Sequence, residues 1–209
     1  MALTTALVLC YFLGSFPTAL IAGKILGGVD IRTTGSGNAG ATNLYRLFGL
    51  KPYMAVLMLD MAKGFISSKW VSQIGLGGTL DGLELGTLCG VVAVLGHVFS
   101  VFASFKGGKG VATAAGVMLA VAPGPLLAAI GVYLVVISIT HYVSLGSISA
   151  ALSVPAWLAT SRIAFGAEIR WEVYSLSVLL AVMIIATHRA NIKRLIKGEE
   201  LKTRFFNKD

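Results

Sequence analysis

Charged residues are scarce in this sequence. Of its 209 residues, 12% are charged and 56% are hydrophobic, whereas roughly a quarter of the residues of soluble domains are charged. The mean hydropathy is +0.83. This composition excludes an ordinary soluble enzyme. It predicts an all-α integral membrane protein that crosses the bilayer several times and forms a single domain over residues 1–209.

Cysteine is nearly absent as well. Cys10 and Cys89 both lie in apolar runs, so we interpret them as small core residues and not as a disulfide or a metal site. No residue pattern indicates a metal or an organic cofactor, a nucleic-acid partner or an obligate protein partner. The first apolar run lacks the basic start and the cleavage pattern of a signal peptide, so we expect it to remain as a membrane span.

The apolar runs predict seven transmembrane helices. The expected spans are Ala2–Leu26, Pro52–Gln73, Leu85–Ser104, Val111–Ala122, Leu126–Thr140, Val143–Thr160 and Val173–Thr187. Pro123, Gly124 and Pro125 predict a hairpin turn that divides the long run from Val111 to Thr140 into two spans. Val111–Ala122 is shorter than the roughly 20 residues of a full span, so we expect neighbouring helices to shield it or the preceding loop to extend it.

The basic residues give the orientation. With seven spans and the N-terminus outside, the cytoplasmic side carries Lys24, Arg32, Arg46, Lys51, Lys106, Lys109 and the seven basic residues of the tail after Thr187. The outside carries only Arg162 and Arg170. Positive residues concentrate on the cytoplasmic side of membrane proteins, so the pattern favours seven spans with a cytoplasmic C-terminus. One kinked span over Val111–Thr140 would put the basic tail outside.

The stretch Phe105–Thr113, here called the glycine–lysine loop, interrupts the apolar sequence. It holds Lys106, Gly107, Gly108, Lys109 and Gly110. Glycines leave backbone N–H groups bare, and such groups beside lysines and a following helix start can bind a phosphate or a carboxylate. The alternative is a tight basic loop on the cytoplasmic side. The residues after Lys109 are not Ser or Thr, so this is not an ATP-binding P-loop.

A second polar stretch is Gly35–Asn43, followed one turn later by Arg46. Its glycine and polar positions are Gly35, Ser36, Gly37, Asn38, Gly40, Thr42 and Asn43. The pattern G-x-G-x-x-G occurs here, but no strand precedes it and Asp60 lies in a predicted span, so dinucleotide binding is excluded. The amides, hydroxyls and bare N–H groups suit an anion and a polyol. A flexible connecting loop is the alternative, with Thr42 or Asn43 serving only to cap the next helix.

The other polar residues lie in or near the spans. Asp60 and Lys63 share a helix face and predict a structural ion pair, because ionisable groups in a span usually pair. His97, near the cytoplasmic end of its span, is interpreted as a buried histidine that bonds to a loop. His188 and Asn191 share a helix face beyond the last span. We interpret Arg189 and the basic tail as an anchor at the membrane interface.

On this layout four polar segments return to one side of the membrane. They are Gly35–Asn43, the glycine–lysine loop, His141–Ser147 and His188–Asn191. Together with neighbouring strings, these segments resemble the bacterial acyl-phosphate:glycerol-3-phosphate acyltransferases, the PlsY family. The strings that carry the resemblance are Val29–Arg32, Gly35–Asn43, Asp60–Gly64, Gly96–His97, Phe105–Thr113, Tyr142–Leu145 and His188–Ile192. Their order and spacing over nearly the whole chain are much more specific than any one string.

The resemblance implies a seven-helix membrane enzyme of the bacterial inner membrane, with its active site facing the cytoplasm. Such an enzyme transfers a fatty acyl group from acyl phosphate to the 1-hydroxyl of glycerol 3-phosphate and forms lysophosphatidic acid. The residues that the resemblance assigns to the polar site are Ser36, Arg46, Lys109, Ser144, His188 and Asn191. It also implies that the glycines around Lys109 hold a phosphate.

The chemistry of the residues agrees with this reaction. Both substrates carry phosphate, which calls for two anion-binding loops, and fixed N–H groups and lysines stabilise the charge that develops during transfer. The acyltransferase signature His-x-x-x-x-Asp is absent: the residues five positions after His97, His141 and His188 are Phe102, Gly146 and Lys193. We therefore hypothesise that the phosphate of glycerol 3-phosphate takes the hydroxyl proton, while His188 and Asn191 orient the acceptor.

Three other interpretations remain open at the level of sequence. A transporter for a small anion also uses broken helices and glycine loops, but no matching polar set lies outside and no inverted repeat is visible. An intramembrane hydrolase would pair Ser36 or Ser144 with His188, which requires a contact that sequence alone does not show. A purely structural helix bundle would leave the four polar segments unexplained.

Overall fold

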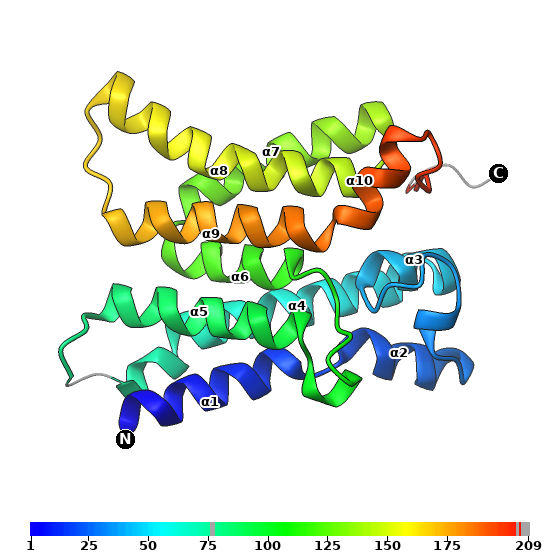
Figure 1. The fold of residues 1–209 in the computed structure, drawn as a ribbon, viewed down its shortest axis with the longest axis horizontal. Coiled ribbons are helices and arrows are strands. Elements are labelled where there is room, and N and C mark those ends of the chain that lie inside the picture. Colours follow the sequence, from blue (N-terminus) through cyan, green and yellow to red (C-terminus); the bar gives the residue numbers. More distant parts are fainter. Residues whose placement is uncertain (76–77, 204, 206–209) are drawn as a thin grey trace. The chain divides into compact units, whose positions relative to one another are not determined.

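The helices of the protein follow its apolar runs (Figure 1). The computed structural model describes residues 1–75, 78–203 and 205, and within these ranges it contains ten α-helices, three short 3-10 helices and no strand. The α-helices are α1 (Ala2–Ser15), α2 (Thr18–Gly27), α3 (Ala41–Phe48), α4 (Leu50–Lys69), α5 (Gly82–Val98), α6 (Val111–Val121), α7 (Pro123–Thr140), α8 (Val143–Phe165), α9 (Trp171–Thr187) and α10 (Arg189–Ile196). The 3-10 helices are Ile31–Thr33, Val71–Gly75 and Val101–Ala103.

Over the described part of the chain, four helical stretches are long and apolar enough to cross a membrane. They are Ala2–Gly27, Gly82–Ala103, Pro123–Thr140 and Val143–Phe165. Helices α9 and α10, which meet at a bend of 61°, form a possible fifth span. α6 is apolar but shorter, and α4 has 20 residues but carries several charged ones. The structure thus confirms an all-helical membrane protein, and every span that the sequence predicts coincides with a helix or a pair of helices.

The chain divides into two compact units, Met1–Val121 and Ala122–Asp209. The boundary lies at the Pro-Gly-Pro sequence. α6 ends at Val121 and α7 begins at Pro123, because proline has no N–H to continue a helix but fits well at the first position of one. The break that the hairpin prediction requires between two helices is therefore present.

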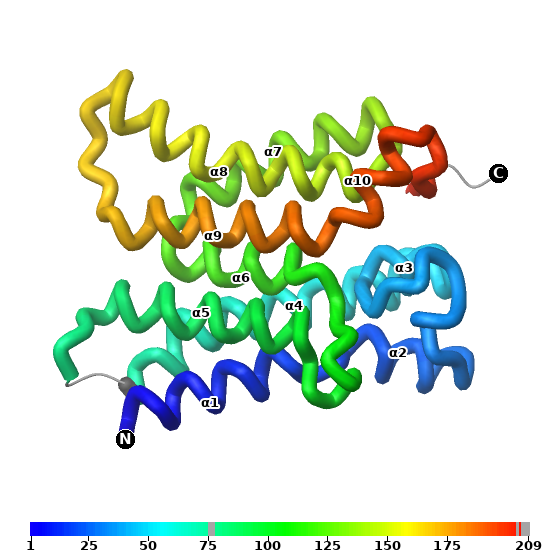
Figure 2. The backbone as a smooth tube through the Cα atoms, in the orientation of Figure 1, coloured from blue at the N-terminus to red at the C-terminus, as the bar shows by residue number. Residues whose placement is uncertain are grey.

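In the first unit α1 packs along α5 and α4 packs along α6, as the backbone tube in Figure 2 also shows. Two glycines let α4 and α6 approach closely. A Cβ atom on Gly116 would lie 1.8 Å from the carbonyl oxygen of Met61, and one on Gly64 would lie 2.0 Å from that of Thr113. Small residues at helix crossings are the usual means of close packing in a membrane, where apolar side chains gain little from leaving lipid.

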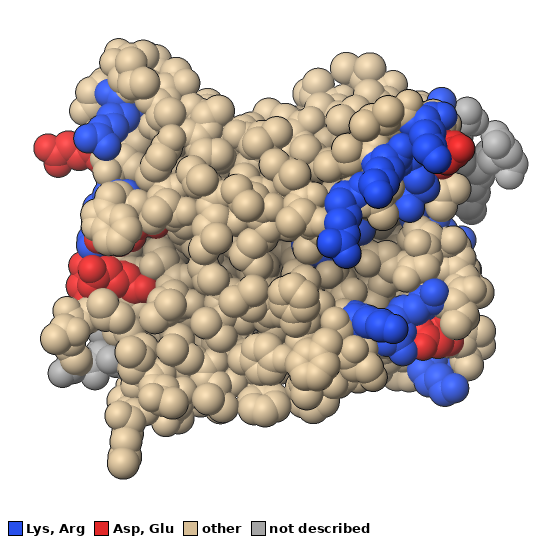
Figure 3. Space-filling view, viewed as in Figure 1, with Lys and Arg blue, Asp and Glu red and all other residues tan. Residues whose placement is uncertain are grey.

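In the second unit α8 packs against both α7 and α9, and α10 turns away from the end of α9. After α10, Gly198 takes a left-handed conformation with φ of 72° and reverses the chain. The N–H of Thr203 then donates to the carbonyl of His141, so the tail returns to the turn between α7 and α8. Figure 3 shows basic side chains gathered over the α10 end of this unit, and both basic and acidic side chains near the α8–α9 loop.

Candidate functional site

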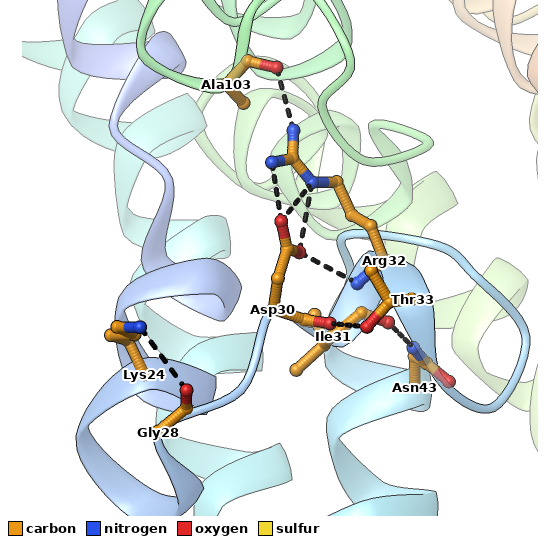
Figure 4. A network of polar contacts seen from close by, with 8 residues as sticks. All are labelled: Lys24, Gly28, Asp30, Ile31, Arg32, Thr33, Asn43 and Ala103. Atoms are coloured by element: carbon orange, nitrogen blue, oxygen red, sulfur yellow. Dashed lines mark hydrogen bonds and ion pairs between the residues drawn. The ribbon is translucent and has the colours of Figure 1, made fainter.

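The loop before α3 is shaped by one buried side chain, that of Asn43 (Figure 4). Its Nδ2 donates to the carbonyl oxygens of Ile31 at 2.7 Å and Thr34 at 3.0 Å, and its Oδ1 accepts from the N–H of Ser36 at 2.8 Å. Asn43 is fully buried. The sequence predicts that Asn43 binds substrate, but in the structure its amide makes hydrogen bonds within the loop and positions the half-buried Ser36.

Arg32 pairs with Asp30 in the same loop and hydrogen-bonds the segment that precedes the glycine–lysine loop. Arg32 Nη2 lies 2.7 Å from Asp30 Oδ2, and Arg32 Nη1 donates to the carbonyl of Ala103 at 3.0 Å. The side-chain hydrogen bond from Arg32, followed by the one from its backbone, lowers the pKa of Asp30 below its usual value. The sequence marks these two residues only as part of a matching string, because nothing in it shows that Ala103 lies within reach.

The glycine–lysine loop is a tight turn built on the end of α5. Ser104 and Phe105 have positive φ angles of 54° and 60°. The N–H of Gly107 donates to the carbonyl of Val98 at 3.0 Å, and the N–H of Gly108 donates to that of His97 at 3.2 Å. The expectation of a continuous row of bare N–H groups is therefore wrong at these two glycines. Their small size is what the turn requires, since a Cβ atom on Gly107 would lie 2.0 Å from the carbonyl oxygen of His97.

Anion-binding groups remain at the end of this loop. α6 begins at Val111, and the first N–H groups of a helix have no acceptor within it. Gly110 has a φ of 80°, and its carbonyl accepts the N–H of Ala114. The half-buried Lys109 immediately precedes this helix start, and Lys106 is exposed. The positive end of the helix and the lysines together suit a phosphate.

The two loops of the first unit meet. Ala39 from one loop and Gly107 and Gly108 from the other line the same small cavity, together with His97. Its volume of about 10 Å³ suffices for one water molecule and excludes any substrate.

Helix α3 carries two further predicted site residues. Thr42 and Arg46 lie one turn apart and both are half-buried. The helix begins at Ala41 with Gly40 as its N-cap, so the alternative that Thr42 or Asn43 is only a helix cap is wrong. Gly35, Gly37 and Asn38 lie in the loop that Asn43 supports, and Gly35 and Gly37 have positive φ angles. These residues thus lie in one loop and in the helix that follows it.

The predicted ion pair of α4 is present and is buried. Lys63 Nζ lies 2.7 Å from Asp60 Oδ1, and the two side chains are 5% and 3% exposed. Lys63 also donates to the carbonyl oxygen of Phe16, and Thr18 donates its hydroxyl to Asp60. Phe16 and Thr18 flank the break between α1 and α2, so the pair stabilises that break.

The second unit holds a polar cluster around Glu200. Its Oε1 accepts hydrogen bonds from Ser144 Oγ at 2.7 Å and Asn191 Nδ2 at 2.6 Å, and its Oε2 accepts one from Arg194 Nε at 2.7 Å. The Glu200 side chain is 3% exposed. Burial raises the pKa of Glu200, but the hydrogen bonds from Asn191, Ser144 and Arg194 outweigh burial, so its pKa lies below the usual value.

The sequence pattern predicts only a basic anchor for the tail and does not indicate Glu200 as a site residue. The structure instead folds the tail back onto the start of α8 and gives it a buried carboxylate. A single acidic pair, Glu199 and Glu200, within a basic tail was the available signal. Ser144 and Asn191 are far apart in sequence, and both are predicted to belong to one site. In this cluster both donate to Glu200.

His188 lies at the bend between α9 and α10 and is 2% exposed. Its ring nitrogen Nδ1 lies 2.8 Å from the carbonyl oxygen of Ile184. A carbonyl only accepts hydrogen bonds, so Nδ1 carries the hydrogen and Nε2 is the acceptor in the neutral ring. His188 is the N-cap of α10, and Asn191 is the third residue of that helix. That the two side chains share a helix face stays a prediction.

Within the described ranges no group of three or more His, Cys, Asp or Glu side chains is placed to hold a metal ion. Cys10 and Cys89 are buried and free. Among the described residues, the buried histidines are His97 in the first unit and His188 in the second, and the buried carboxylates are Asp60 in the first unit and Glu172 and Glu200 in the second.

Comparison with known proteins agrees with this chemistry. Residues 4–198 match the glycerol-3-phosphate acyltransferase family. The glycerol-3-phosphate acyltransferase of Chlorobaculum tepidum is 43% identical, with 97% of each chain covered, and that of Chlorobaculum parvum is 42% identical, with 95% of each covered. Both are similar to this chain over nearly their whole length.

Two solved structures are also similar. The crystal structure of PlsY, an integral membrane glycerol 3-phosphate acyltransferase, in its glycerol 3-phosphate form gives a TM-score of 0.86 at 37% identity and covers 98% of this chain and 96% of its own. The lysophosphatidic acid form of PlsY gives 0.84 at 36% identity, covering 98% and 97%. The chain belongs to the PlsY family of integral membrane glycerol-3-phosphate acyltransferases.

Proposed function

We propose that this acyltransferase takes its fatty acyl group from acyl phosphate and transfers it to the 1-hydroxyl of sn-glycerol 3-phosphate. The products are lysophosphatidic acid and inorganic phosphate, in the first acylation step of bacterial phospholipid synthesis. The observation that carries the donor assignment is that two loops of the first unit meet at Ala39, Gly107 and Gly108. One loop holds Ser36 and leads into α3 with Arg46, and the other holds Lys109 and leads into α6. Two such loops suit two phosphate groups.

The proposed catalytic residues are Ser36, Lys109, His188 and Asn191. Substrate binding involves Gly35, Gly37, Asn38, Thr42, Asn43, Arg46, Lys106, Gly107, Gly108, Gly110 and Ser144, with Asn43, Gly107 and Gly108 acting through the shape of their loops. Asp60, Lys63 and His97 support the site from within the bundle. The proposal treats residues 1–209 as one functional domain. No cofactor or obligate protein partner is required.

The reaction proceeds without an acyl-enzyme. The acceptor hydroxyl oxygen attacks the acyl carbonyl carbon, the bond from that carbon to the donor phosphate oxygen breaks, and inorganic phosphate leaves with the electron pair. The phosphate of glycerol 3-phosphate takes the hydroxyl proton. Ser144 donates its hydroxyl hydrogen to Glu200, which argues against Ser144 as a nucleophile activated by a histidine. Lysine and N–H donors stabilise the charge on the departing phosphate.

His188 orients the acceptor in this mechanism. With Nδ1 donating to the carbonyl of Ile184, Nε2 is an acceptor suited to a substrate hydroxyl. Replacement of His188 by glutamine should therefore reduce kcat and weaken glycerol 3-phosphate binding together. Calorimetric binding of glycerol 3-phosphate, measured beside turnover, tests this role. If turnover is abolished while binding is intact, His188 is instead the general base.

The proposed topology has seven spans, with the N-terminus outside and the C-terminus and active site on the cytoplasmic side of the bacterial inner membrane. It counts α4 and α6 as spans in addition to the stretches that qualify by length and apolarity. The gathering of basic side chains over α10 supports a cytoplasmic tail.

The deciding experiment is lysophosphatidic acid formation by purified protein in lipid vesicles, with palmitoyl phosphate and labelled glycerol 3-phosphate. Acyl-CoA and acyl carrier protein donors run in parallel. We expect product from acyl phosphate only, lost in Lys109→Ala but retained in Lys69→Ala, a matched exposed lysine at the end of α4. Product from acyl-CoA would overturn the donor. No product from any donor would overturn the acyl transfer itself and favour anion transport.

A further inference from the structure

His97 lies between a buried ion pair and the glycine–lysine loop. One ring nitrogen, Nδ1, lies 3.8 Å from Asp60 Oδ1, and the residue is 9% exposed. Asp60 is in turn held by Lys63 at 2.7 Å and by the hydroxyl of Thr18. On its Nδ1 side, the imidazole therefore faces charged and polar groups of α4 and of the start of α2.

On its Nε2 side, the ring packs against the glycine–lysine loop. A Cβ atom on Gly108 would lie 2.3 Å from His97 Nε2, so the bare Cα of Gly108 rests directly against the ring. The N–H of Gly108 donates to the main-chain carbonyl of His97, and that of Gly107 donates to Val98. Lys109 and the start of α6 follow immediately, so a displacement of Gly108 displaces both proposed phosphate-binding groups.

We infer that His97 is a positioning residue that seats the glycine–lysine loop, with Asp60 and Lys63 fixing its ring. The glycine at position 108 is then needed for contact with this imidazole. The inference rests on the proposed function where it concerns substrate affinity. Its structural part, that the His97 ring positions the loop at Gly108, rests only on the packing of His97, Gly108 and Asp60.

A double-mutant cycle tests the seat. Gly108→Ala should raise the KM for a phosphate-bearing substrate about tenfold, because the new methyl group meets the ring, whereas kcat changes less. In a His97→Ala background the ring is absent, and the same Gly108→Ala change should raise KM by no more than about twofold over His97→Ala alone. An equal effect of Gly108→Ala in both backgrounds would overturn the inference.

Gly107 provides the matched control. Its added Cβ would meet the main-chain oxygen of His97 at 2.0 Å, and that oxygen is still present in His97→Ala. The Gly107→Ala penalty should therefore be the same with and without the His97 ring. If His97→Ala relieved both glycine substitutions equally, the relief would come from general loosening of the loop, and the side-chain seat would be refuted.

A second readout is independent of the reaction. Lys106 is exposed in the turn, so limited digestion with trypsin, followed by mass spectrometry, reports the rate of cleavage after Lys106. Gly108→Ala should accelerate this cleavage about tenfold over wild type, and by no more than about twofold over His97→Ala when combined with it. Should the wild type form no lysophosphatidic acid, the proposed function fails, while the cleavage rates still decide whether His97 seats the loop.

Discussion

At the residue scale, single buried polar groups set the geometry of both units. Asn43 closes the loop before α3, and Glu200 ties the tail to α8. The sequence predicts the Asp60–Lys63 pair because ionisable groups stand out in an apolar run. It does not predict the burial of Glu200, which depends on the left-handed turn at Gly198 that folds the tail back. Because the tail is polar and basic, its sequence gives no sign that the Glu200 carboxylate is buried against Ser144.

Replacement of Glu200 should destabilise the protein in a pH-dependent way. Its pKa is lowered in the folded state, so its contribution is complete above the ordinary carboxyl value of 4.5 and is lost as the pH falls through the folded pKa. The difference in melting temperature between wild type and Glu200→Gln in detergent should therefore be constant near neutral pH and shrink in acid. Glu199→Gln, at an exposed neighbour, should show no such difference. If the difference in melting temperature between wild type and Glu200→Gln grew in acid, this prediction would be wrong.

Removing one charge of the buried Asp60–Lys63 pair should destabilise the protein more than removing both charges. Lys63→Met alone leaves the carboxylate of Asp60 without its cation, which should cost about 3–5 kcal/mol of unfolding free energy. Asp60→Leu combined with Lys63→Met removes both charges and should recover much of that loss. Thermal unfolding in one detergent compares the variants. A double variant less stable than Lys63→Met would show that the hydrogen bonds to Thr18 and Phe16 dominate instead.

At the element scale, the long apolar helices could be predicted and the short polar ones could not. Proline and glycine mark the boundary between α6 and α7 directly. The expected span Ala2–Leu26 is instead two helices, α1 and α2, that break at Phe16 and Pro17. A proline inside an apolar run does not by itself say whether a helix bends or ends. α3 and α10 are eight residues each and amphipathic, too short to produce an apolar run.

The crossing of α4 and α6 depends on glycine at position 116. A Cβ atom there would lie 1.8 Å from the carbonyl oxygen of Met61, which is backbone and cannot turn aside. Gly116→Ala should therefore separate the helices and cost about 2 kcal/mol or more. Gly131→Ala in α7 is the matched control, because no atom lies within 4 Å of its Cβ position. That change should be neutral or stabilising by about 0.5–1 kcal/mol. Equal melting temperatures for both variants would refute the tight crossing.

At the scale of the whole molecule, the number of spans is the main prediction still to be tested. The basic residues favour seven, whereas length and apolarity alone select four or five helices. The difference depends on α4 and α6. Counting both as spans leaves the orientation of the α8–α9 loop and the tail unchanged, because two crossings cancel. It reverses the side on which the α4–α5 and α5–α6 connections lie.

Cysteine labelling can therefore separate the two counts. Cys10 and Cys89 have no exposed surface, so they should remain silent toward a membrane-impermeant maleimide. Glu168→Cys in the α8–α9 loop and Lys197→Cys after α10 are exposed positions that calibrate the assay. With either number of spans, Glu168→Cys should react in intact cells, and Lys197→Cys should react only after the inner membrane is permeabilised.

Two further exposed positions distinguish seven spans from five. With seven spans Thr79→Cys, between α4 and α5, lies outside and should react in intact cells, while Phe102→Cys, between α5 and α6, should react only after permeabilisation. With five spans both results reverse, because α5 then crosses in the opposite direction. The glycine–lysine loop follows Phe102 directly, so its accessibility also tests whether the proposed phosphate-binding groups face the cytoplasm. Labelling of Phe102→Cys in intact cells would overturn the seven-span topology and the cytoplasmic site together.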